Sequence, residues 1–371
     1  MEVPNFLFPS LLLLLPALYL ILKHFKASKS LPIPPGPFSW PIIGNPLEIG
    51  ENPLATLTQF GQIYGPLFSI KLGSQRVVVA SSSAVAMEIL KTQDRLLSGR
   101  FVPHVSPSKS PELNSRSVAW SLECNESWKY LRTVCRTQLF LGKAIETQAY
   151  LRKEKVRKMI KYIISNEGKP LKVRDIPLAM TFNMVGNTLM STDLINFEQE
   201  SEDGGMSGVL RTIMEIVQEE LAGEIIQDEV TESHLPKLPY LQACVKETLR
   251  LHPPVPFLLP HRAVESCQVL NYTIPKDSQV LVNIRAIGRY PKYWKDPLVF
   301  KPERFLESSL DIKGHDFEFL PFGAGRIICP GLPMATKHVP LGVASLVQLC
   351  DRSLPYGKDP KSLDMSEKCN I

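Results

Sequence analysis

The order of apolar and polar residues predicts the first regular elements of this chain. Residues 67–72 and 76–80 are β-rich runs separated by a Gly-Ser-Gln turn, so they predict a hairpin. Apolar positions then recur at helical spacing over residues 83–90, with the first serine of that range as the expected cap. Apolar and polar residues alternate again over residues 279–284, which predicts a further strand.

Longer periodic segments predict helices. Residues 241–251 form a strong helical pattern that two prolines end, and an apolar, helix-compatible segment follows residue 331. By contrast, residues 101–117 lack periodicity and residues 254–260 are rich in proline, so both predict loops, and we expect them to face a ligand. Together these patterns predict a chain with both α-helices and short β-strands.

The N-terminus predicts a membrane anchor. Phe6–Leu22 is almost continuously apolar and is followed by lysines, whereas the first residues carry no Lys or Arg. An uncleaved anchor over residues 1–25 explains this better than a cleaved signal peptide, and the lysines place the rest of the chain in the cytosol. Residues 26–40 are basic and then proline-rich, which predicts a stiff, extended hinge to the body at residues 41–371.

Composition narrows the possible functions. The chain has 371 residues, 44% of them hydrophobic, which is enough for one large domain or two smaller ones. A net charge of +5 without a long basic block makes nucleic acid a poor candidate partner. The seven cysteines are scattered without zinc-type spacing, so we expect most of them to be reduced and buried.

One cysteine has an unusual setting. Cys329 lies in the run 321–331, Pro-Phe-Gly-Ala-Gly-Arg-Ile-Ile-Cys-Pro-Gly, directly before the last predicted helix. Glycine leaves backbone N–H groups accessible, and such donors can stabilise a thiolate in a buried place. A thiolate of this kind is suited to axial ligation of a haem iron, whereas the alternative is an ordinary loop cysteine among glycines.

Two further constellations carry charge in a helical register. Trp128 and Arg132 are four residues apart, so an indole N–H and a guanidinium could converge on one anion; the alternative is a half-buried Trp beside a solvated Arg. Glu247 and Arg250 are three apart, which is typical of a surface ion pair. Arg304, in a Pro-Glu-Arg-Phe segment, would convert that pair into a buried lock if it lay within reach.

These motifs occur together in the order found in cytochrome P450 enzymes, and the chain resembles plant microsomal members that hydroxylate alkaloids and monoterpenoids. The resemblance runs from the proline-rich hinge to residues 364–368. It implies a P450-like fold that is mainly α with small β-sheets (α+β), is internally truncated here and binds haem b. It also implies electrons from an NADPH-dependent reductase on the endoplasmic reticulum membrane, O₂ as oxidant, and a small, largely apolar substrate.

The resemblance also implies roles for individual residues. Cys329 would be the axial ligand of the iron, and Glu247, Arg250 and Arg304 would form a structural lock on the same side. The residues expected around the haem and its propionates are Phe322, Gly323, Arg326, Trp128, Arg132 and either His261 or Arg262.

The sequence departs from the family pattern at three places. Ile327 stands where the family usually has an arginine, so one propionate contact is expected to be lost. The (A/G)Gx(D/E)T(T/S) element that relays protons during oxygen activation is absent; the nearest text, residues 221–226, lacks the hydroxyl. We therefore expect an internal deletion near residue 218, and no catalytic acid and threonine pair is assigned. The chain also ends, at residues 369–371, before the usual terminal strand pair.

Three hypotheses follow from these observations. The first is a membrane-anchored haem-thiolate monooxygenase. The second is a truncated relative without turnover, with or without haem, produced by a splice form or an error in the gene model. The third is a membrane-surface scaffold that uses only the anchor and the hinge, in which case the cysteine loop would have no chemical meaning. The presence of a thiolate-ligated haem separates the third from the first.

Overall fold

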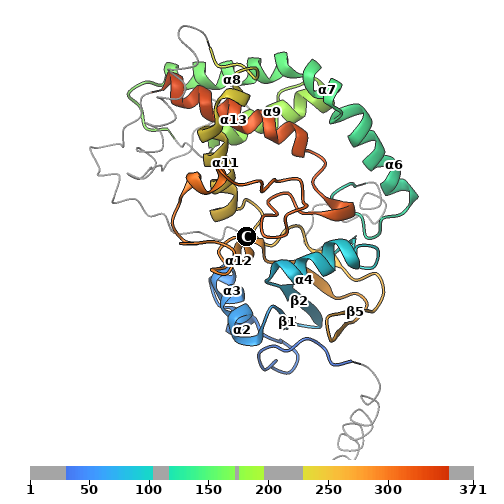
Figure 1. Cartoon of the computed structure of the whole chain (residues 1–371). Helices are drawn as coiled ribbons and strands as arrows, with labels where there is room; N and C mark the ends of the chain where they lie inside the picture. Colours follow the sequence, from blue (N-terminus) through green and yellow to red (C-terminus); the bar gives the residue numbers. More distant parts are fainter. Residues whose placement is uncertain (1–30, 103–116, 172–174, 196–228, 351–371) are drawn as a thin grey trace, which may run out of the picture.

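The computed structural model describes residues 31–102, 117–171, 175–195 and 229–350. The strands gather at one end of the molecule, whereas helices α6 to α9, α11 and α13 form the other end (Figure 1). The expected anchor, the expected deletion, most of the loop 101–117 and the chain's end at 369–371 lie outside the described residues.

The α-helices of the described part are α2 (Pro46–Ile49), α3 (Pro53–Tyr64), α4 (Ser83–Met87), α6 (Glu126–Val134), α7 (Gly142–Thr147), α8 (Ala149–Ser165), α9 (Asp175–Met190), α11 (Pro239–Leu251), α12 (Ile284–Ile287) and α13 (Leu332–Leu349). Wider, π-type turns extend α4 over Glu88–Thr92 and α6 over Cys135–Leu139. Short 3₁₀ turns occupy Leu235–Lys237, Pro302–Phe305 and Gly325–Ile327.

The main sheet joins distant parts of the chain. Its strands are β1 (Leu67–Leu72), β2 (Gln75–Ala80), β7 (Gln279–Val282), β4 (His261–Arg262) and β3 (Gly99–Arg100), in that spatial order. Only the β2–β7 pair is parallel. A separate hairpin pairs β5 (Cys267–Val269) with β6 (Tyr272–Ile274). Buried side chains of α4, α12 and the segment before Cys329 cover one face of the sheet.

The predicted hairpin at residues 67–80 is confirmed, as are the helix at 241–251, the strand at the start of 279–284 and the helix after the cysteine loop. The cap of α4 differs from the prediction. Ser82, not the next serine, accepts a hydrogen bond from the Val85 N–H at 3.4 Å, because the backbone of Ser82 is still extended.

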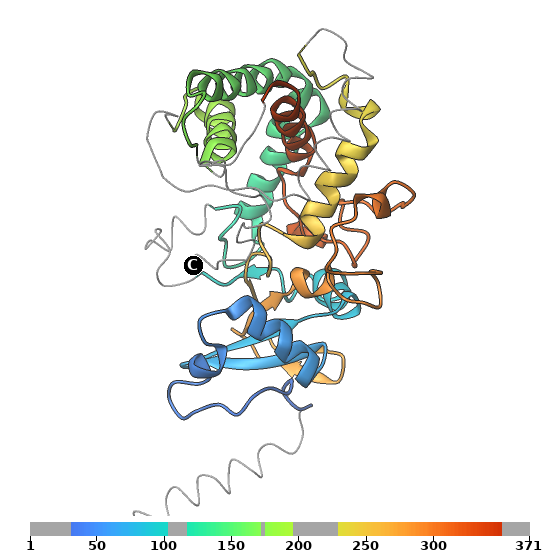
Figure 2. The same cartoon turned by 90° about the vertical axis from the view of Figure 1, so that its left-hand side faces the viewer.

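Helices α8, α9, α11 and α13 share a second core (Figure 2). Helices α9 and α13 approach closely at Gly342, where an added Cβ would lie 3.0 Å from Met180 Cε. A polar contact lies beside it: the Thr181 hydroxyl donates to the Pro177 carbonyl at 2.8 Å and is 3.1 Å from His338 Nε2. Since the hydroxyl proton is committed to Pro177, His338 Nε2 must be the donor to Thr181.

The proline-rich segment lies along the sheet. Ser69 donates from its backbone N–H to the Pro35 carbonyl and from its hydroxyl to the Pro34 carbonyl, both at 2.7 Å. Because a side chain on Gly36 would overlap the Ser69 carbonyl, this contact requires glycine. In the described part, no helix is both long and apolar enough to span a membrane.

Candidate functional site

The cysteine loop is held in shape by backbone contacts. The Cys329 N–H donates to the Phe322 carbonyl at 3.0 Å, which closes the loop on itself. Gly323 and Gly325 have φ values of 73° and 66°, a region that favours glycine. A Cβ on Gly325 would lie 2.0 Å from the Leu90 carbonyl oxygen. Only glycine therefore allows the loop to pack against the π-type turn that extends α4.

Cys329 is a partly buried free thiol beside the start of α13. Burial raises the pKa of this thiol, while hydrogen bonding from the Gly331 backbone, the charge of Arg132 and hydrogen bonding from Leu332 act in the opposite direction. The two backbone donors and the guanidinium thus favour the thiolate over what burial alone would allow. This is the arrangement that a soft metal ligand needs.

Helix α6 presents Trp128 and Arg132 on one face. The Asn125 side chain caps this helix by accepting from the Trp128 N–H at 3.0 Å. The Arg132 guanidinium carbon lies 5.6 Å from the centroid of the Trp128 ring, a cation–π contact. The Trp128 indole N–H, however, donates to the Val118 carbonyl at 3.1 Å. In the described part, Arg132 has this aromatic contact but no hydrogen bond or ion pair, so its donors are available to an anion.

Arg100, on β3, is a buried cation that the sequence analysis missed. Its Nη1 donates to the Leu259 carbonyl at 2.9 Å, but its buried Nε has no hydrogen-bond partner. Burial, together with the charge of Arg132, lowers the pKa of Arg100 to about 10, while Cys124 acts in the opposite direction. The sequence signal that could have drawn attention to it is an arginine with apolar residues on both sides, Leu97 before it and Phe101 after it.

His261, on β4, lies next to Arg100 and is fully buried. Its Nδ1 is 2.8 Å from the Leu97 carbonyl, which can only accept, so Nδ1 carries the proton. Burial and the charge of Arg100 lower the pKa of His261 to about 3. Neutral His261 therefore offers an acceptor at Nε2, and it could donate to a carboxylate there only as the imidazolium.

Two predicted residues already have acidic partners. Arg262 is paired with Asp277 across the strand ends, with Nη2 and Oδ1 2.5 Å apart. Arg326 is paired with Asp94, with Nε and Oδ2 3.4 Å apart. Arg326 and Ile327 also line one narrow space together with His261, and this space is too small to hold a ligand.

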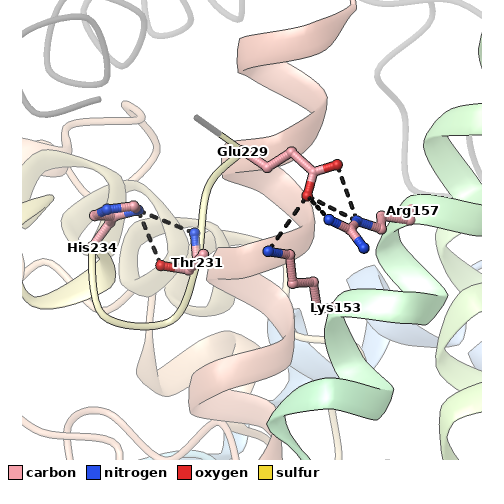
Figure 3. Close-up of a pocket in the computed structure, with 5 residues that line it drawn as sticks. All are labelled: Lys153, Arg157, Glu229, Thr231 and His234. Atoms are coloured by element: carbon pink, nitrogen blue, oxygen red, sulfur yellow. Dashed lines mark hydrogen bonds and ion pairs between the residues drawn. The ribbon is translucent and has the colours of Figure 1, made fainter. Parts of the chain in front are cut away.

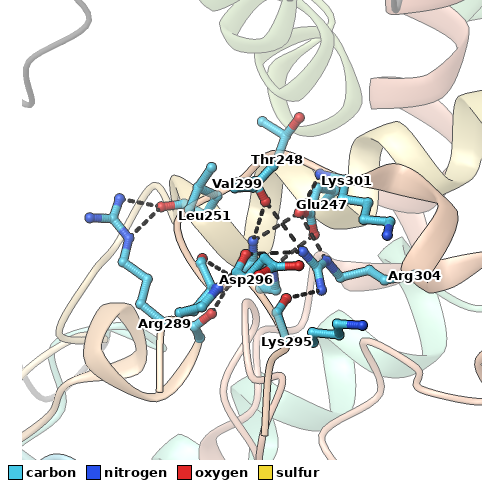
Figure 4. A network of polar contacts seen from close by, with 12 residues as sticks. Glu247, Thr248, Leu251, Arg289, Lys295, Asp296, Val299, Lys301 and Arg304 are labelled. Atoms are coloured by element: carbon cyan, nitrogen blue, oxygen red, sulfur yellow. Dashed lines mark hydrogen bonds and ion pairs between the residues drawn. The ribbon is translucent and has the colours of Figure 1, made fainter. Parts of the chain in front are cut away.

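The structure brings Glu247, Arg250 and Arg304 together, and Glu247 and Arg304 are labelled in Figure 4. Glu247 is fully buried on α11, and its two oxygens accept from Arg250 Nε at 2.7 Å and Arg250 Nη2 at 2.8 Å. Oε2 accepts the first of these hydrogen bonds and Oε1 accepts the second. Oε1 also accepts from Arg304 Nε at 3.1 Å and from the Lys301 backbone N–H at 2.8 Å.

The remaining donors of the two arginines bind backbone carbonyls. Arg250 Nη1 donates to Gly288 at 2.5 Å and to Pro297 at 2.8 Å, and Arg304 Nη1 donates to Lys295 at 2.9 Å. The carboxylate is thus shared by two guanidinium groups whose other ends fix the segment between α12 and the Pro302–Phe305 turn. A lock of this kind fixes the backbone, because each guanidinium group that binds Glu247 also donates hydrogen bonds to backbone carbonyls of other segments.

A second pocket, of about 460 Å³, lies between α8 and the segment that leads to α11 (Figure 3). Its carboxylate, Glu229, is bound by Arg157 with Nη2 and Oε2 2.7 Å apart, and by Lys153 at 3.5 Å. His234 and Thr231 complete the lining and contact each other. None of the residues predicted from the sequence lines this pocket, so we place the candidate site at Cys329.

The donor set around Cys329 fits haem. A thiol with backbone support can supply the axial ligand, and two guanidinium groups with unused donors, Arg100 and Arg132, can receive carboxylates. The segment 254–260 lies beside the cysteine loop, since a Cβ on Gly323 would contact Leu258 at 3.6 Å. Sequence reasoning identified the cysteine and Arg132, whereas the structure adds Arg100.

Comparisons with known proteins agree with this chemistry. The family description "Cytochrome P450" matches residues 34–204 and 211–369. The (S)-N-methylcoclaurine 3'-hydroxylase isozyme 1 of Papaver somniferum is 39% identical, with 95% of both chains covered. Corytuberine synthase of Coptis japonica is 34% identical, with 91% of both chains covered. A solved zebra fish cytochrome P450 structure with abiraterone has a TM-score of 0.67 at 21% identity and covers 80% of this chain and 91% of its own.

The alignment with the Papaver relative is longer than this chain. It extends over 461 residues, against 371 in the whole chain, so at least 90 aligned positions have no counterpart here.

Proposed function

We propose, on the premise that this chain belongs to the cytochrome P450 family of haem-thiolate monooxygenases, that Cys329 is its axial haem ligand. The observation that carries this proposal is the thiol of Cys329 in a closed glycine loop, beside the backbone of Gly331 and Leu332 and within the field of Arg132. When bound, haem supplies the centre for O₂ activation, and a thiolate ligand favours O–O cleavage.

The cations near Cys329 would hold the haem carboxylates. Arg132 and Arg100 are the first candidates, because both are charged and both have donors without partners among the described residues. Trp128 would support Arg132 through its ring, since its N–H is already used by Val118. His261 would join them only if a carboxylate raised its pKa enough to protonate Nε2.

The lock formed by Glu247, Arg250 and Arg304 would support the site indirectly. It fixes the segment that leads from α12 to the Pro302–Phe305 turn, on the side from which the chain continues to the cysteine loop. Its role would be to hold the approach to that loop, not to contact substrate.

We infer the substrate class from the named relatives. Several of them are (S)-N-methylcoclaurine 3'-hydroxylases, and this supports a small, largely apolar plant alkaloid as the substrate. Electrons would come from an NADPH-dependent reductase. Residues 1–25 would anchor the chain in the endoplasmic reticulum membrane, with residues 26–40 leading to a cytosolic body, because Phe6–Leu22 is apolar and the lysines follow it.

A second candidate function is haem binding without turnover. The oxygen-activating motif is absent from the sequence, at least 90 positions of the Papaver alignment are missing, and the family match breaks between residues 204 and 211. An apolar stripe on α9 is also exposed, with side chains at helical spacing: Leu178, Phe182, Val185 and Leu189. Such a stripe is usual where a covering element is lacking, so an internal deletion near residue 218 supports this candidate.

One experiment tests both candidates. The full chain is expressed in microsomes, reduced and exposed to carbon monoxide, and the Soret band is compared between the parent and Cys329→Ser. A red-shifted band that is lost in the variant supports thiolate ligation, and its absence from the parent refutes both candidates. If the band is present, NADPH, reductase and (S)-N-methylcoclaurine are then added: hydroxylated product supports the first candidate, and no product supports the second.

A further inference from the structure

Helix α9 is apolar on two opposite faces. One face, with Ile176 and Met180, is buried in the core that α9 shares with α8 and α13. On the other side of the helix, four large apolar side chains recur at helical spacing and are 37% to 55% exposed: Leu178, Phe182, Val185 and Leu189. We call this set the α9 stripe. Asp175 is the only charged residue of α9, and a helix that is apolar all round is normally buried all round.

The α9 stripe has the dimensions of a helix-packing surface. Figure 2 shows α9, in light green, at the edge of the helical end, next to α8. Leu178 and Leu189 are eleven residues apart, so at a rise of about 1.5 Å per residue the stripe is about 17 Å long. One helix laid along α9 would bury such a surface, because packed helices interlock their side chains over several turns.

The chain contains a segment that matches this surface. Residues 208–222 lie outside the described residues, and their sequence predicts an amphipathic helix, with Ser207 as a suitable N-cap and Gly223 as a suitable end. Apolar residues recur at helical spacing between these two: Leu210, Ile213, Met214, Val217 and Leu221. The first and last of them are eleven residues apart, so the predicted apolar face is as long as the α9 stripe.

The described chain leaves and returns close to α9. After α9 it runs back along the helix, and the Leu194 and Ile195 N–H groups both donate to the Asn183 side-chain oxygen at 2.8 Å. On return, Glu229 is bound to α8, the neighbour of α9, with Arg157 Nη2 and Glu229 Oε2 2.7 Å apart. The links from residue 195 to 208 and from 222 to 229 can extend to about 40 Å and about 20 Å, more than the spacing of about 8–10 Å between packed helices.

Charge also favours this segment over a second copy of the chain. Residues 196–228 carry nine acidic residues and one arginine, whereas α8 carries six basic residues and one acidic residue. Lys158 of α8 lies at the end of α9, since its Nζ is 3.1 Å from Asp193 Oδ2. The acidic segment therefore complements the surroundings of the α9 stripe, whereas a dimer through two such stripes would bring two basic α8 helices together.

We propose that residues 208–222 form a helix that packs along the α9 stripe of the same chain. The apolar face of this helix contacts the stripe, so α9 is buried on both sides and the helical end is complete within one copy. The expected deletion near residue 218 thus joins two pieces of sequence into one helix that supplies the missing partner of α9. This inference goes beyond haem binding and does not depend on it.

Photo-cross-linking tests the proposal in the full chain. Phe182 is replaced by the cross-linker benzoylphenylalanine, and an equal mixture of unlabelled and isotope-labelled protein is irradiated, digested and analysed by mass spectrometry. We expect cross-linked peptides that join α9 to residues 208–222 and in which both peptides carry the same label. The same replacement at Phe38, an exposed phenylalanine at the sheet end, is the matched control and should give no cross-link to residues 208–222.

A pair of glutamate variants tests which face of the predicted helix makes the contact. Ile213→Glu places a charge on the apolar face, and we expect it to lower the yield of the cross-link from position 182 by about tenfold, because a charge is disfavoured in an apolar contact. Thr212→Glu adds the same charge on the polar face, and the yield should stay within about twofold of the parent. Equal yields in the two variants would contradict the predicted face.

The remaining outcomes overturn the proposal. Cross-linked peptides that carry different labels would mean that a second copy occupies the α9 stripe. Cross-links from position 182 only to other parts of the same chain, or no cross-links at all, would mean that residues 208–222 do not lie there. The measurement needs no haem, so its failure leaves the Soret test of Cys329 untouched, and a missing Soret band leaves this inference untouched.

Discussion

Replacing Glu247 by glutamine should strongly destabilise the fold. Glu247 is completely buried and shares its carboxylate between Arg250 and Arg304. The substitution removes the negative charge and turns one acceptor into a donor that faces guanidinium N–H groups. Arg250, also inaccessible to solvent, would then keep its charge with only neutral partners, the amide oxygen and backbone carbonyls. Breaking a buried pair in this way costs about 3–5 kcal/mol.

The measurement is urea unfolding followed by tryptophan fluorescence. Trp294 is a local reporter, since its ring centroid lies 5.1 Å from the Arg250 guanidinium carbon. With a slope of about 2–3 kcal/mol per M, a loss of about 3–5 kcal/mol moves the midpoint by about 1–2.5 M. Glu303→Gln is the matched control: the same change on an exposed side chain of the neighbouring turn should alter stability by less than about 0.5 kcal/mol. If both variants had the same midpoint, the lock would not stabilise the fold.

Three further predictions concern the cysteine loop and the helical end. Gly325→Ala should destabilise the loop by about 2–4 kcal/mol and abolish the thiolate Soret band, because its Cβ would overlap the Leu90 carbonyl. Gly331→Ala should be tolerated in the fold, because its Cβ would make only an ordinary contact of 3.9 Å with the Cys329 Sγ. Haem affinity, measured by Soret titration, should rise about tenfold per pH unit between pH 6 and 8, because ligation displaces the proton of Cys329 and burial raises the pKa of this thiol. A haem affinity that does not change with pH in the parent would contradict this. Burial and the charge of Arg152 lower the pKa of His338 to about 4, against 6.5 in the unfolded chain. The free energy of unfolding should therefore fall by up to about 3 kcal/mol between pH 6.5 and pH 4, and it should fall by less in His338→Gln.

The sequence could predict features that depend on local spacing. Helical spacing alone brings Glu247 and Arg250 together, and the glycine run marks the cysteine loop. Both features could therefore be predicted from the sequence. Arg304 could be proposed only because a known family pattern places it with them. Its contact with Glu247 bridges more than fifty residues, which no local pattern encodes.

Features that depend on distant pairing could not be predicted. Arg100 is buried because β3 pairs with β4, which follows some 160 residues later. Arg262 is an arginine in the expected place, but the pairing of β4 with β7 brings it beside Asp277 instead. The 92% exposure of the Ile42 side chain could not be predicted either, because an apolar run gives no information on whether another element covers it.

The parallel pairing of β2 with β7 has a consequence for synthesis on the ribosome. Val77 pairs with Gln279, about 200 residues further along, so one edge of the N-terminal hairpin stays open until about three quarters of the chain has been made. At about 5–20 residues per second, this interval lasts on the order of 10–40 s. Throughout that time the nascent chain carries an unpaired edge of valines, which is a template for association with other chains, so its yield in a cell depends on what shields that edge during translation.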